Sequence, residues 1–220
     1  MERKDTFIPS EFYHIYNRGI EKRLIFEEEK DWKRFQDLLY LCNSRIPLVF
    51  KSIQGDTLDY ERGKGLVSVI AYSLMPNHFH LILREEQDGG ISKFLTRIST
   101  AYSMYFNTKN KRSGGLFCRP FRAKHINNDE YFRWVISYIH LNPLDIFEPG
   151  WKLKGLKNAV VASDFLKDFA FSSYPDYFPG DRKEGVILER SALPMDISEL
   201  EDMEAMLKID RSFQGVTLER

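Results

Sequence analysis

The stretch 78–83, His-Phe-His-Leu-Ile-Leu, constrains the fold most, because polar and apolar side chains alternate along it with period two. The preceding Met-Pro-Asn segment, 75–77, interrupts any strand, since proline cannot donate a hydrogen bond within a central ladder. Phe79, Leu81 and Leu83 are expected to face a core, with the two histidines on the opposite face. The pattern therefore predicts a strand that belongs to a sheet.

Other segments carry strand or helix periodicity. Short apolar or alternating runs predict strands at 12–17, 46–53 and 66–71, the last two joined by a hairpin loop, and a short extended segment within 116–125. Apolar residues at helical spacing predict helices at 31–42, 91–106 and 129–141. Asn128 is expected to cap the third helix and Pro143 to end it. This order predicts an α+β fold, a ferredoxin-like sandwich with an antiparallel sheet and helices on one face.

The chain length bounds the domain organisation. With 220 residues we expect one main domain, at 1–150, and a C-terminal extension, at 151–220, that packs on it and has an acidic tail. No run approaches the ~18 apolar residues of a membrane span, and no secretory signal begins the sequence, so we expect a cytoplasmic protein with no membrane partner. Cys42 and Cys118 are too far apart and too few for a thiolate metal site.

Charge is unevenly distributed although the formal net charge is zero. Between Gly89 and Asn128 there is no acidic residue, whereas eight basic residues occur. They are Lys93, Arg97, Lys109, Lys111, Arg112, Arg119, Arg122 and Lys124. Such a segment is typical of a surface that follows DNA phosphates, and the alternative is a solvated helix face.

His78 and His80 are the candidate metal ligands. They leave the same face of a strand, so their imidazoles can converge on one divalent cation. The alternative is that they merely share a solvated face. A third ligand would have to be oxygen or another histidine, which favours Mg²⁺ or Mn²⁺ over a closed zinc site.

Tyr138 and Asn142 lie four residues apart and thus on one face of the predicted third helix. A hydroxyl and an amide oxygen are thereby presented together. The alternative is a packed aromatic residue followed by an ordinary Asn-Pro helix end.

Five motifs together resemble one family. They are Tyr13-His14-Ile15-Tyr16-Asn17-Arg18-Gly19, Met75-Pro76-Asn77-His78-Phe79-His80-Leu81-Ile82-Leu83, Leu116-Phe117-Cys118-Arg119-Pro120-Phe121-Arg122-Ala123, Ser137-Tyr138-Ile139-His140-Leu141-Asn142-Pro143 and Phe171-Ser172-Ser173-Tyr174. In this order they resemble the HUH-type single-tyrosine transposases of the IS200-like kind, and most nearly the REP-associated tyrosine transposases.

The resemblance implies an enzyme that cleaves and rejoins single-stranded, hairpin-bearing DNA. Tyr138 would be the nucleophile that forms a 5′-phosphotyrosine, and His78, His80 and Asn142 would hold the metal. The partner would be DNA, the protein a monomer or homodimer, and its place the cytoplasm and, when bound to DNA, the nucleoid. Two alternatives stay open: a non-catalytic DNA-binding regulator, and a metal-dependent phosphoesterase that uses water as its nucleophile.

Overall fold

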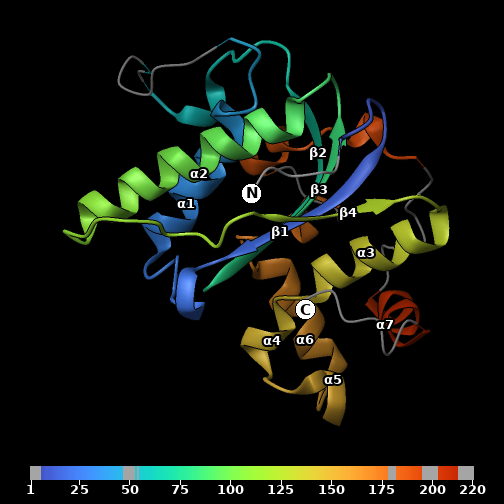
Figure 1. Ribbon diagram of the computed structural model, residues 1–220. Helices are drawn as coiled ribbons and strands as arrows, with labels where there is room; N and C mark the ends of the chain where they lie inside the picture. The colour runs from blue at the N-terminus through green and yellow to red at the C-terminus, as the bar shows by residue number, and fades with distance from the viewer. Residues whose placement is uncertain (1–5, 47–52, 54, 178–181, 195–202, 213–220) are drawn as a thin grey trace.

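A computed structural model describes residues 6–46, 53, 55–177, 182–194 and 203–212, and within them the chain forms one sheet of four antiparallel strands (Figure 1). The strands are β1 (Phe12–Arg18), β2 (Val67–Met75), β3 (His78–Glu85) and β4 (Arg122–Ile126), in the spatial order β2-β3-β1-β4. The turn at 75–78 joins β2 to β3, as the proline predicted. Most of the predicted strand at 46–53 lies outside the described residues, and β2 forms its hairpin with β3 instead.

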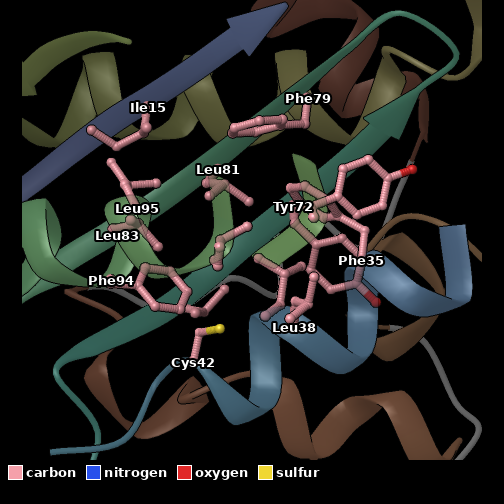
Figure 2. Packing of buried hydrophobic residues seen from close by; sticks show 14 of the residues in the cluster. Ile15, Phe35, Leu38, Cys42, Tyr72, Phe79, Leu81, Leu83, Phe94 and Leu95 are labelled. Atoms are coloured by element: carbon pink, nitrogen blue, oxygen red, sulfur yellow. The ribbon is translucent and has the colours of Figure 1, made fainter. Parts of the chain in front are cut away.

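One face of the sheet is covered by α1 (Glu29–Leu41) and α2 (Gly90–Lys109) (Figure 1). Phe79, Leu81 and Leu83 point into this layer, as their alternation predicted (Figure 2). Each fully buried side chain of this size contributes about 1.5–3 kcal/mol through removal of apolar surface from water. The element order β-α-β-β-α-β and the strand order are those of a ferredoxin-like fold, so the predicted α+β class is confirmed.

The prediction that all helices cover one face needs correction. The helix α3 (Asp129–Leu141) packs on the opposite face of the sheet, together with α6 (Ala159–Asp168) and α7 (Met203–Ser212) (Figure 1). The reason lies in β2, whose nine residues are all buried. A strand that is apolar on both sides must be covered on both sides, and the near-continuous apolar run of β2 is the signal for it.

The helix α3 has the predicted bounds. Its N-cap is Asn128, whose side-chain oxygen accepts a hydrogen bond from the amide of Tyr131 at 2.7 Å. Its apolar face joins a core with Ile70, Ala71 and Ile82 of the sheet. Two short helices, α4 (Leu144–Phe147) and α5 (Trp151–Lys154), follow it. The division of the chain at residue 150 remains a prediction.

Candidate active site

Two histidines project from the start of β3. The ring centroids of His78 and His80 lie 5.0 Å apart, with the ring planes nearly perpendicular. His80 is fully buried and His78 is partly exposed. The strand thus brings the predicted pair together on the side away from α1 and α2.

In both histidines Nδ1 has a hydrogen-bond partner, and this partner determines which ring nitrogen carries the proton. Nδ1 of His78 lies 2.6 Å from the side-chain oxygen of Asn77, which only accepts, so this nitrogen carries the proton. Nδ1 of His80 lies 3.0 Å from Nε2 of His14. When His80 donates in that bond, both His78 and His80 keep their lone pair on Nε2. This is the tautomer that a metal-binding histidine needs, and such supporting partners commonly orient metal ligands.

Tyr138 reaches this pair from α3 of the same chain. Its ring centroid lies 5.4 Å from that of His80 and 6.2 Å from that of His14. The side chain is almost buried, with 9% of the residue exposed. The candidate nucleophile and the candidate metal ligands therefore meet within one subunit.

Asn142 is the C-cap residue of α3, one turn beyond Tyr138, and is also buried. Its side-chain nitrogen has no hydrogen-bond partner among the described residues. No group of three or more His, Cys, Asp or Glu side chains there could hold a metal by itself. With Asn142 as the third ligand, which the resemblance of the motifs implies, the donor set would be two imidazoles and one amide oxygen, completed by water or phosphate oxygens. This mixed nitrogen and oxygen donor set fits Mg²⁺ or Mn²⁺.

A cavity of about 310 Å³ opens beside the histidines. Of the eight predicted DNA-binding residues, Arg119 and Arg122 line it. Arg18 and Lys22 also line it, and the sequence analysis missed both. Arg18 stands opposite His78 in the pairing of β1 with β3, so only the strand register reveals its place. Four cations around one cavity suit an anionic ligand such as a phosphodiester.

The other predicted DNA-binding residues lie elsewhere. Lys109 is held by acids of the N-terminal end of α1, with Nζ 2.6 Å from Asp31 and 2.8 Å from Glu28. Burial would lower the pKa of Lys109, but these hydrogen bonds outweigh it and raise the pKa. The charge of Lys109 is therefore neutralised by neighbouring carboxylates, and its role in DNA binding stays a prediction.

The remaining cations have mixed surroundings. Arg97 donates to the carbonyl of Ser44 at 2.5 Å, and Arg112 donates to the side chain of Asn107 at 2.6 Å. Lys93, Lys111 and Lys124 are exposed, and the ammonium of Lys124 lies 4.7 Å from the ring centroid of Tyr131. Their role in DNA binding stays a prediction.

Two further residues escaped the sequence analysis. His14 is fully buried, and its ring is hydrogen-bonded to that of His80. Lys152 lies in α5, and its Nζ is 4.5 Å from the centroid of the Tyr138 ring. Neither is marked by local sequence periodicity, because both contacts depend on the packing of distant segments.

The fold and the site define a class of α+β proteins in which a histidine pair on a central strand faces a tyrosine on a covering helix. The family described as "Transposase IS200 like" matches residues 58–142, which include the histidine pair, Tyr138 and Asn142. This segment is therefore similar to IS200-like transposases, in agreement with the resemblance seen in the motifs.

The chain is also similar in structure to a solved protein, the "REP associates tyrosine transposase bound to a REP hairpin". The identity is 14%, the TM-score is 0.48, and the match covers 90% of this chain and 99% of the other. No curated protein matches the chain. Among the described residues, no helix has the length and apolar character needed to cross a membrane.

Proposed function

We propose that this protein is a metal-dependent tyrosine transposase that cleaves and rejoins single-stranded, hairpin-bearing DNA, with Tyr138 as its nucleophile. The observation that carries the proposal is the contact between the rings of Tyr138 and His80 within one chain. The matching family supports strand-transfer chemistry, and the cations at the cavity suit a DNA phosphate. The hairpin substrate is part of the proposal through the likeness of the motifs to REP-associated transposases.

The reaction would be a transesterification. The phenol oxygen of Tyr138 forms a bond to the scissile phosphorus, and the bond between phosphorus and the 3′ oxygen breaks. The phenol loses a proton, and the leaving 3′ oxygen gains one to become a hydroxyl. Rejoining reverses these changes. No co-reactant is consumed, because one phosphoester replaces another.

The residues of the chain have separate tasks in this scheme. His78, His80 and Asn142 would hold Mg²⁺ or Mn²⁺, which when bound neutralises charge that develops on the phosphate oxygens. Arg119 and Arg122, which line the cavity, would bind the DNA backbone. Tyr138 is 9% exposed as a residue, and exclusion of water from its side chain would favour transesterification over hydrolysis.

The test is denaturing gel electrophoresis of the protein with end-labelled, hairpin-bearing single-stranded DNA and Mg²⁺ or Mn²⁺. We expect a slowly migrating covalent adduct with the wild type, and none with Tyr138→Phe or His78→Ala. Tyr131→Phe is the matched control, because Tyr131 lies on the same helix with the same exposed fraction of 9%. It should form the adduct normally.

Other results would select the alternatives. Cleavage that survives Tyr138→Phe and leaves no adduct would indicate a phosphoesterase that uses water. Binding of hairpins without cleavage, across a varied set of sequences, would indicate a DNA-binding regulator.

A further inference from the structure

A cation from outside the matched segment lies over the ring of the proposed nucleophile. The Lys152 ammonium is 4.5 Å from the centroid of the Tyr138 ring, within the range of roughly 6 Å for a cation–π contact. The lysine side chain is 35% exposed, so the contact is partly shielded from water. Lys152 belongs to α5, whereas the family match ends at residue 142.

The chain after α3 holds Lys152 close to the Tyr138 ring. Gly150, the residue before α5, has φ of 85°, a left-handed conformation that glycine adopts without strain. Trp151 is buried in the core that α3 shares, which anchors α5 against the nucleophile helix. Asp145 of α4 lies 3.8 Å from the lysine ammonium and helps to orient it.

We infer that Lys152 is a positioning residue for Tyr138, an inference that rests on the proposed function. The ammonium attracts the electron-rich face of the phenol ring and so restricts the ring to one orientation. A nucleophile held in its attacking orientation reacts faster, because less freedom is lost on the way to the transition state. The segment beyond the family match thereby takes part in the reaction through Tyr138.

The test separates the rate of attack from DNA affinity. Single-turnover adduct formation is measured at saturating protein with wild type, Lys152→Met, Lys152→Arg and Lys154→Met. Affinity for the same hairpin is measured by fluorescence anisotropy in the Tyr138→Phe background. Lys154→Met is the matched control, because Lys154 is an exposed lysine on the same short helix.

We expect Lys152→Met to slow adduct formation by about 2- to 30-fold, the range for loss of a cation–π contact, with DNA affinity changed by less than about twofold. Lys152→Arg should restore the rate, since arginine also stacks on aromatic rings. Lys154→Met should behave as wild type. An unchanged rate with Lys152→Met, or a loss that appears only as weaker DNA binding, would overturn the inference.

A second measurement needs no activity. In protein labelled with ¹³C at its tyrosine rings, the Tyr138 signal is assigned by its loss in Tyr138→Phe. Lys152→Met should shift this signal, and Lys154→Met should leave it in place. If the wild type forms no adduct, the proposed function fails while the ring signal still reports the contact; an unmoved signal would refute the positioning role by itself.

Discussion

The two faces of the sheet differ in what they bury. On the side of α1 and α2, β3 contributes Phe79, Leu81 and Leu83 to an apolar layer. On the side of α3, the same strand contributes His78 and His80, next to the tyrosine of the covering helix. Alternate residues of β3 thus contribute to the apolar core and to the candidate active site. Substitutions of neighbouring residues should therefore have different kinds of effect.

The largest expected effect lies on the apolar face. Phe79→Ala removes a side chain that is 1% exposed and should lower the free energy of unfolding by about 3–5 kcal/mol, because it leaves a cavity. His78→Ala, one residue away and partly exposed, should change it by less than about 1 kcal/mol. Urea denaturation followed by circular dichroism measures both. Equal losses would show that the two faces are not separated in this way.

The next effect concerns the ion pairs of Lys109 with Glu28 and Asp31. Lys109→Met leaves the buried carboxylate of Asp31 without its cation and should cost about 2–3 kcal/mol of unfolding free energy. Lys111→Met, at an exposed lysine two residues away, is the control and should cost little. Thermal or urea unfolding decides. If Lys109→Met keeps the stability of the wild type but loses DNA affinity, Lys109 contacts DNA and does not stabilise the fold.

The same ion pairs predict a pH dependence. Burial would raise the pKa of Asp31, but the hydrogen bonds from Lys109, from the backbone amides of Glu27 and Glu28 and from Tyr105 outweigh it, so the pKa lies below its usual value of 3.8. The stabilisation is therefore present above about pH 4 and is lost as the pH falls through the lowered pKa in the folded state. Urea unfolding between pH 5 and pH 2.5 should show this loss. The unfolding free energy of Lys109→Met should change less with pH over the same range.

His14 provides a test on the face of the sheet that carries His78 and His80. His14→Phe fills the space of the ring but removes the partner of Nδ1 of His80, and should weaken Mn²⁺ binding by about 10- to 100-fold. His14→Gln keeps an acceptor and should weaken binding less. Titration calorimetry with Mn²⁺ measures both variants. If His14→Phe binds Mn²⁺ as the wild type does, the pair does not cooperate in holding a metal.

The smallest effects are expected for the arginines that line the cavity. Arg119→Ala and Arg122→Ala should each weaken hairpin binding by about 3- to 10-fold and reduce the salt dependence by about one phosphate contact. Lys93→Ala, at an exposed lysine of α2, shows whether the surface of the helices α1 and α2 also contacts DNA. Anisotropy titrations at several salt concentrations distinguish these cases.

Local patterns predicted much of the fold. The bounds of α3 and the break before β3 followed from a cap, a proline and an alternation, all of which act over a few residues. The second covered face did not follow from periodicity, because an apolar run such as that of β2 shows burial on both sides but not which helix provides the cover. Helix position on one face or the other is a property of the whole chain.

Only some residues of the candidate site could likewise be predicted from the sequence. His78, His80 and Tyr138 were found from spacing and motif, and the structure brings them together. His14 and Lys152 were not found, because their contacts depend on the register of β1 with β3 and on the turn after α3. Residues that act through a neighbour leave little trace in a single sequence.

The most direct test of the account is to identify the residue that carries DNA. The wild-type protein is incubated with the hairpin substrate and Mn²⁺, the attached DNA is trimmed with nuclease, and the peptides are analysed by mass spectrometry. We predict one nucleotide-modified peptide, with the 5′-phosphate on Tyr138. Modification of another tyrosine, or cleaved DNA with no modified peptide, would contradict the assignment of Tyr138 as the nucleophile.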